Sequence, residues 1–147
     1  MSGFPLLDRR EFSFTAFVHP EPQGSAKAFI VGGRAHVTSD NKKLRPFRSE
    51  VTRCAMVELG TANQPLPFAE KHVPVGVRID CFLARPDSVP KKRLAPSVKP
   101  DLDKLIRSCL DSLTGVGFKD DGQVIEVSAR KHYGSPERVE ITVTILG

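Results

Sequence analysis

The sequence predicts an α+β fold in which a mixed sheet of about five to six strands packs against two main helices. Several stretches alternate apolar and polar residues, which is the period of a half-buried strand. Two others repeat apolar residues every three or four positions, which is the period of a helix with one buried face. The chain has 147 residues and 39% hydrophobic content, enough for one core but little for a second. We therefore expect a single domain over residues 1–147.

The first half of the chain contains a predicted strand, a hairpin and a helix. Apolar residues alternate with polar ones from 11 to 19, which indicates a half-buried strand. Two short segments, 27–30 and 34–37, flank a pair of glycines, a pattern typical of a β-hairpin. Apolar residues then fall on helical spacing from 41 to 60, which predicts the first long helix.

The second half begins with a strand and a loop and ends with two strands. Alternation from 75 to 81 predicts the strand, and the prolines and basic residues between 85 and 100 predict a stiff, basic loop. Further strands are expected at 123–133 and 138–146, joined by a Gly-Ser-Pro turn. The second helix lies between the loop and these last strands.

This second helix carries the most informative pattern in the chain, because acidic residues stand at both of its ends. Pro100 disfavours a helical conformation in the residue before it, so the helix starts with Asp101 as its N-cap or first-turn residue. At the start of a helix, the carboxylates of Asp101 and Asp103 can converge on one point. The predicted buried face consists of Leu102, Leu105, Ile106, Cys109, Leu110 and Leu113.

Asp120 and Asp121 come after the helix and a glycine-containing turn, and before the strand predicted at 123–133. A strand that packs back on the helix would return these acids to Asp101 and Asp103. Three or four carboxylates in a small volume cannot all stay ionised unless a cation neutralises them. Hard oxygen ligands without nearby Cys or His suit Mg²⁺ or Mn²⁺. Such a site can activate water and stabilise charge on a phosphoryl group.

The same residues also fit ordinary structural roles. An Asp after Pro is a good N-cap, first-turn acids suit the helix dipole, and an Asp pair before Gly is common turn chemistry. Arg107 stands four residues from both Asp103 and Asp111, which fits the middle of a surface ion-pair ladder. It fits equally a cation that holds a scissile phosphate beside a metal site. Spacing alone leaves both interpretations open.

The net charge of +5 around an acidic site indicates a polyanionic partner, and nucleic acid is the natural candidate. Basic residues gather in the hairpin, the first helix and the loop before Asp101. We assign them to sequence-independent phosphate contacts, and the alternative is a solvated surface that only aids solubility. The candidate DNA-binding residues are Lys27, Arg34, Lys42, Lys43, Arg45, Arg48, Lys91, Lys92, Arg93 and Lys104.

Several classes of protein are disfavoured. No apolar run is long enough to span a membrane, and the first residues lack the apolar core of a secretory signal. Cys54, Cys81 and Cys109 lie far apart in apolar stretches, which favours reduced core thiols over disulfides or zinc ligands. We expect a cytoplasmic protein, or one in the host cytoplasm if it is viral, without a small-molecule cofactor.

The segments PDLDKLIRSCLDSLTG and FKDDGQV resemble the signature of the RusA family of Holliday junction resolvases, found in bacteria and their phages. The resemblance implies that Asp101, Asp103 and Asp121 bind metal and act in catalysis, with Asp120 as the adjacent acid. Arg107 stands where the family usually has its catalytic lysine, and Lys104 where it usually has Asn. A planar guanidinium is not equivalent to a compact ammonium at a phosphate site.

The resemblance further implies a RusA-like fold and a magnesium-dependent endodeoxyribonuclease, with Mn²⁺ as a possible substitute, that resolves four-way junctions by paired symmetric nicks during recombination and repair. A junction with two-fold symmetry and a chain with one site imply a homodimer. Two rival functions remain: a less selective nuclease of branched or flap DNA, and a catalytically inactive junction-binding protein. The departures at Lys104 and Arg107 motivate the second.

Overall fold

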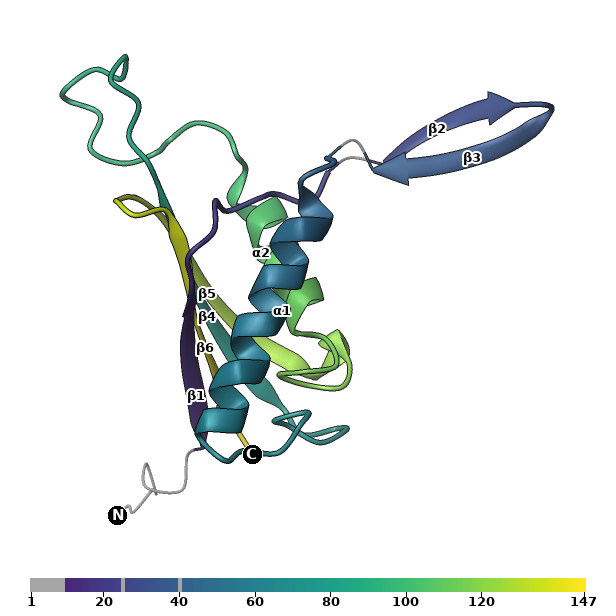
Figure 1. The fold of residues 1–147 in the computed structure, drawn as a ribbon, viewed down its shortest axis with the longest axis vertical. Helices are drawn as coiled ribbons and strands as arrows, with labels where there is room; N and C mark the ends of the chain where they lie inside the picture. The colour runs from purple at the N-terminus through teal and green to yellow at the C-terminus, as the bar shows by residue number, and fades with distance from the viewer. Residues whose placement is uncertain (1–9, 25, 40) are drawn as a thin grey trace.

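Two helices cover one face of a four-stranded sheet, and a two-stranded hairpin extends away from this body (Figure 1). The computed structural model describes residues 10–24, 26–39 and 41–147, without the side chains of 26–29 and 36–39. In chain order, the elements are β1 (Glu11–Ala16), β2 (Ala26–Val31), β3 (Arg34–Ser39), α1 (Leu44–Thr61), β4 (Val75–Leu83), α2 (Leu102–Leu113), the short 3₁₀ helix η2 (Asp121–Gln123), β5 (Val124–Tyr133) and β6 (Arg138–Ile145).

The main sheet is mixed and has the strand order β1-β6-β4-β5. Strand β6 pairs antiparallel with both β1 and β4, whereas β5 lies parallel to β4 and forms one edge of the sheet. Parallel neighbours need a long crossover connection, and the chain supplies it through α2. The direction of β5 is therefore fixed by the helix that precedes it.

The core lies between the helices and one face of the sheet. Alternate residues of β1, β4 and β6 are buried, which accounts for the period of two in their sequences. Phe47 and Leu59 of α1 meet Leu105 and Leu113 of α2 in the same buried cluster. Helix α1 packs on β1 and on α2, while α2 packs on β4 and β5. The acid-bearing helix thus lies on the β5 side of the sheet.

The predicted α+β class and both helices are confirmed. All the predicted strands are present, but they divide into two sheets, because β2 and β3 pair only with each other. The first strand ends at Ala16 rather than at His19. Ala16 is also the last residue of β1 that pairs with β6, where it lies opposite Val139. Residues 85–100 contain neither helix nor strand, as the prolines predicted.

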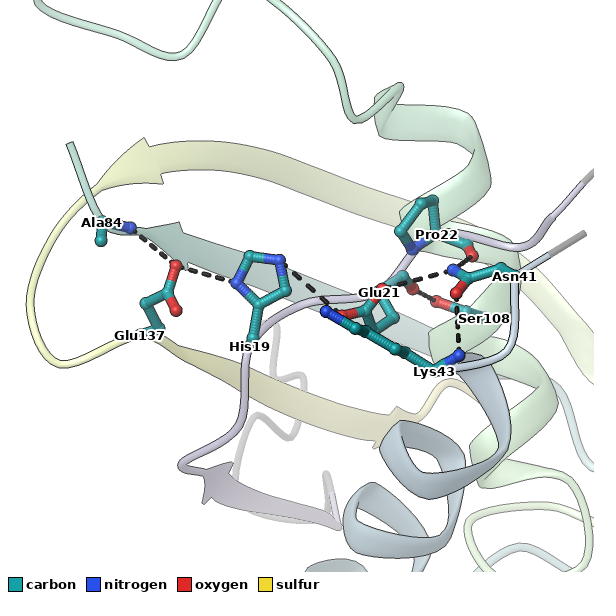
Figure 2. A network of polar contacts seen from close by, with 8 residues as sticks. All are labelled: His19, Glu21, Pro22, Asn41, Lys43, Ala84, Ser108 and Glu137. Atoms are coloured by element: carbon teal, nitrogen blue, oxygen red, sulfur yellow. Dashed lines mark hydrogen bonds and ion pairs between the residues drawn. The ribbon is translucent and has the colours of Figure 1, made fainter. Parts of the chain in front are cut away.

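A chain of polar contacts fixes the segment between β1 and the hairpin (Figure 2). Glu137 Oε2 accepts a hydrogen bond from the Ala84 amide at 3.0 Å and lies 2.9 Å from His19 Nδ1. The other ring nitrogen of His19 lies 3.8 Å from a carboxylate oxygen of Glu21. Burial acts to raise the pKa of Glu137, but the hydrogen bonds from Ala84 and His19 outweigh it and hold the pKa below its ordinary value of 4.5.

Asn41 extends this network to the base of the hairpin (Figure 2). Its side-chain amide donates to Pro22 O at 2.8 Å and to Glu21 Oε1 at 3.3 Å, and its Oδ1 accepts from the Lys43 amide at 3.0 Å. Ser108 Oγ of α2 donates to Glu21 O at 2.7 Å. Both chain segments that lead into the hairpin are thereby tied to the start of α1 and to α2.

Glu137→Gln is expected to weaken the acid dependence of stability. A carboxyl whose pKa is lowered by folding stabilises the folded state above its ordinary pKa, and this contribution is lost as the pH falls through the lower folded value. The variant should therefore be less stable than the wild type at pH 7, and the difference should shrink below about pH 4.5. Urea unfolding between neutral and acidic pH measures this, with the exposed Glu70→Gln as control. A difference that stays constant with pH would contradict the assignment.

Candidate functional site

Asp101 and Asp103 stand at the start of α2, as predicted. Asp101 is the N-cap, with extended backbone (φ −70°, ψ 135°), and its carbonyl accepts hydrogen bonds from the amides of Lys104 and Leu105 at 3.2 Å each. Its carboxylate makes no capping bond and is 49% exposed, with Lys104 Nζ at 3.9 Å. Asp103 is exposed in the first helical turn. Both carboxylates are therefore available to an external ligand, and Asp101 already lies near a cation.

Arg107 is exposed on α2, one turn beyond Asp103. Among the described residues, it forms no ion pair with Asp103 or with Asp111. The structure therefore does not contain the ion-pair ladder, which was one of the two interpretations that the spacing left open. The guanidinium remains accessible on the same helix as the two acids, which is compatible with the phosphate-binding interpretation.

Asp120 and Asp121 lie in the turn that leads into β5. Asp120 caps η2, because its Oδ1 accepts a hydrogen bond from the Gly122 amide at 3.2 Å. Asp121 is exposed at the first position of η2. Asp120 therefore has the structural role of an acid that caps a turn. The carboxylate of Asp121 makes no such bond within the described part of the chain and remains available to an external ligand.

Gln123 anchors this turn, a role that the sequence analysis missed. Its buried side chain accepts hydrogen bonds from the amides of Lys119 and Asp120, both at 2.9 Å. The same side chain donates to Glu70 O at 2.7 Å and to Val73 O at 3.0 Å. A capping-box pattern, with an acid at the N-cap and Gln at the third helical position, was the signal that could have revealed it. The first two bonds hold Gln123 to the acidic turn, and the last two attach the turn to the loop before β4.

The two acid pairs lie at opposite ends of β5, so the expectation that one chain gathers them is wrong. The turn with Asp121 leads into the first residue of β5, whereas Lys131 near the end of that strand donates to Pro100 O at 2.8 Å, directly before Asp101. At about 3.3 Å per residue, this strand separates the pairs by about 20 Å. Within the described ranges, no cluster of three or more His, Cys, Asp or Glu side chains could hold a metal ion.

The physical reason for this separation is the direction of the chain. Helix α2 runs away from Asp101, the chain turns through Asp120 and Asp121, and β5 then runs back beside the helix (Figure 1). It is the far end of β5, not its beginning, that returns to the start of α2. The strand packs beside the helix as predicted. Its direction, however, places Asp120 and Asp121 at the opposite end of the helix from Asp101 and Asp103, so the four acids do not form a site within one chain.

The predicted basic residues surround the start of α1 and the approach to α2. Arg45 and Arg48 line a groove of about 920 Å³ whose walls come from α1 and α2. Lys42 and Lys43 are exposed just before α1, and Arg34 is exposed at the hairpin turn. In the loop before Asp101, Lys91 and Lys92 are exposed and Arg93 is half-buried, while Lys104 is half-buried on α2. The side chain of Lys27 lies outside the described residues.

Cys54, Cys81 and Cys109 are free thiols, and the last two are buried, as expected for core cysteines. None of the helices in the described part of the chain combines the length and apolar character needed to cross a bilayer.

Gln123→Leu is expected to lower the free energy of unfolding by about 2–4 kcal/mol, because it leaves buried amide and carbonyl groups without partners. It should also loosen the turn that carries Asp121. Urea unfolding measures the first effect, and hydrogen exchange at the Lys119 and Asp120 amides the second. Lys119→Gln is the matched control, since only the backbone of Lys119 takes part. Unchanged exchange in Gln123→Leu would refute the anchoring role.

Comparison with known proteins agrees with the sequence signature. The family described as endodeoxyribonuclease RusA matches residues 18–144. "Uncharacterized protein YqaN" of Bacillus subtilis is 29% identical over 140 residues, covering 88% of this chain and 93% of that protein. Crossover junction endodeoxyribonuclease RusA of Escherichia coli is 30% identical over 117 residues, and the protein of that name from Enterobacteria phage 82 is 28% identical; each match covers 78% of this chain and 80% of the relative. The chain therefore belongs to the RusA family of endodeoxyribonucleases.

Proposed function

We propose that this protein is a magnesium-dependent homodimeric resolvase that cuts four-way DNA junctions by paired symmetric nicks, in recombination and repair in the cytoplasm of a bacterium or of a phage host. The family and the printed names of its relatives support the reaction. One structural observation supports the dimer: two accessible acid pairs lie at opposite ends of the same edge strand. A site with all of these acids requires a second copy of the chain.

The free edge of β5 is the surface we assign to that second copy. One side of β5 pairs with β4, and in the described sheet no strand pairs with its other side. Ile125 and Val127 on this strand are 68% and 39% exposed, and unpaired edges with apolar side chains are templates for strand pairing. If two copies of β5 pair antiparallel about a two-fold axis, the start of each lies beside the end of the other. Asp121 of one copy then approaches Asp101 and Asp103 of the second.

The donor set fits a hard divalent cation once both copies contribute. Asp101, Asp103 and Asp121 supply carboxylate oxygens, the ligands that Mg²⁺ prefers and Mn²⁺ accepts, and Asp120 stands beside them. When bound, the metal polarises the scissile phosphate and lowers the pKa of an attacking water. Arg107 is exposed one helical turn from Asp103, where its guanidinium can hold the phosphate and stabilise the charge of the transition state.

The basic residues support binding of DNA arms on either side of the dimer. Arg45 and Arg48 in the groove between α1 and α2 offer contacts to the phosphate backbone, and Lys91 and Lys92 are exposed in the loop that leads to Asp101. Such contacts do not depend on base sequence. Two equivalent sites related by a two-fold axis match the two-fold symmetry of a four-way junction, which accounts for paired nicks.

One observation favours a second candidate function, a junction-binding protein without nuclease activity. Lys104 Nζ lies 3.9 Å from Asp101 Oδ2, so this carboxylate already has a cationic neighbour where the family usually has an amide. Competition between the ammonium and a metal ion would weaken metal binding. The side chains of Lys104 and Asp101 are 43% and 49% exposed, however, and ion pairs this accessible to water contribute little, so a divalent cation can displace the ammonium at small cost.

Cleavage of end-labelled DNA tests the resolvase proposal. Wild-type protein with Mg²⁺ is expected to nick a synthetic four-way junction symmetrically and to leave linear duplex and flap DNA largely uncut. Asp101→Asn should lower the cleavage rate at least about 10³-fold, because it removes a ligand that supports several kcal/mol of charge stabilisation, while junction binding persists. Equal activity on flaps would favour the less selective nuclease. Binding without cleavage under any metal would favour the inactive binding protein.

Mixing two inactive variants tests whether each site draws on two chains. A heterodimer of Asp101→Asn and Asp121→Asn contains one site without either acid and one site with both, so it is expected to regain a single nick per junction. Coexpression with different affinity tags allows the heterodimer to be purified. Asp101→Asn with Asp103→Asn is the control, because both changes fall in the same half of the site and no intact site results. No recovery in the first pair would contradict the composite site.

A further inference from the structure

Lys131 joins the end of β5 to the loop that delivers Asp101. Its register partner is the buried Cys81, so the side chain lies on the helix-covered face of the sheet and is half-buried there. The ammonium donates hydrogen bonds to Val98 O at 2.7 Å and to Pro100 O at 2.8 Å. A cation with two short bonds to main-chain carbonyls restrains the backbone at both points.

Few other hydrogen bonds restrain the loop before Asp101. Residues 94–100 contain prolines, which lack an amide donor, and the hydrogen bonds within 85–97 are local, such as Arg93 N to Pro90 O and Ser97 N to Ala95 O. In the described part of the chain, the hydrogen bonds from Lys131 are the ones that connect 94–100 to the sheet. Among the hydrogen bonds of the described residues, this one side chain therefore holds the backbone directly before Asp101 to the sheet.

We propose that Lys131 is a positioning residue for Asp101. The inference rests on the proposed function, in which the Asp101 carboxylate binds metal. By holding Pro100 O, Lys131 fixes the extended backbone of the N-cap, and this sets the direction in which the carboxylate leaves the start of α2. Residues that orient metal ligands without touching the metal commonly change metal affinity by about 10- to 100-fold when they are replaced.

The neighbouring residue provides a matched control. Arg130 precedes Lys131 on the same strand, is exposed, and projects from the opposite face of the sheet because side chains alternate along a strand. Lys131→Met keeps much of the aliphatic stem and removes the donors, whereas Arg130→Met removes a positive charge of the same strand without touching the loop. Lys131→Arg keeps both charge and donors and serves as the conservative variant.

The first measurement uses the protein without metal or DNA. The amides of Lys104 and Leu105 bond to Asp101 O, so they report on the first turn of α2. Lys131→Met is expected to raise their hydrogen-exchange rates at least severalfold, with Arg130→Met unchanged and Lys131→Arg close to wild type. Unchanged exchange in Lys131→Met would overturn the proposal, since the loop would then be held by something else.

The second measurement is Mn²⁺ binding to the protein, followed by the magnesium dependence of junction cleavage. Lys131→Met should weaken Mn²⁺ binding about tenfold, raise the Mg²⁺ concentration for half-maximal cleavage by a similar factor, and recover much of its rate at saturating Mg²⁺. The affinity for junction DNA should stay the same, and Lys131→Arg should restore metal binding. A purely structural role would lower thermal stability without moving the metal dependence.

The outcomes separate this inference from the function on which it rests. If wild type binds Mn²⁺ and cleaves junctions while Lys131→Met does both equally well, Lys131 is not a positioning residue and the resolvase proposal stands. If Lys131→Met loses affinity for DNA but keeps its metal dependence, Lys131 contacts substrate instead, which also overturns the proposal. If wild type neither binds Mn²⁺ nor cleaves, the proposed metal site fails and this inference fails with it.

Discussion

The parallel pairing of β4 with β5 is the constraint on which the rest of the structure depends. Parallel neighbours require a crossover, the crossover contains α2, and β5 must then run back along the helix from its end to its start. Strand β5 also lies at the edge of the sheet, with one acid pair at each of its ends. The divided acids follow from the direction of β5 and the exposed edge from its place in the strand order, and our dimer proposal uses both.

Two side chains, one directly before β5 and one near its end, attach the acids to the fold. Gln123 fixes the turn with Asp120 and Asp121 through four hydrogen bonds, and Lys131 bonds the carbonyls before Asp101. Both anchors use main-chain groups of distant loops, so the acids themselves stay exposed. The two roles fall on different residues: buried or half-buried side chains hold the backbone in place, and the accessible carboxylates remain free to bind a ligand.

Local features were predictable from the sequence because their causes are local. The start of α2 follows from Pro100 and the apolar spacing after it, and the strand at 75–83 follows from alternation. Spacing gives the period of an element but not which end of it meets a neighbour, so the separation of Asp101 from Asp121 could not be derived. The partners of Gln123 lie at Glu70 and Val73, about fifty residues away, which no local pattern encodes.

The hairpin formed by β2 and β3 has a consequence for how such proteins diversify. It extends from the body, its strands bond only to each other, and its attachment depends on residues such as Asn41 and Glu21 at its base (Figure 2). Changes in its length or composition therefore leave the core packing intact, whereas changes at its base do not. A hairpin of another length or composition can therefore replace this one at little cost to the stability of the core.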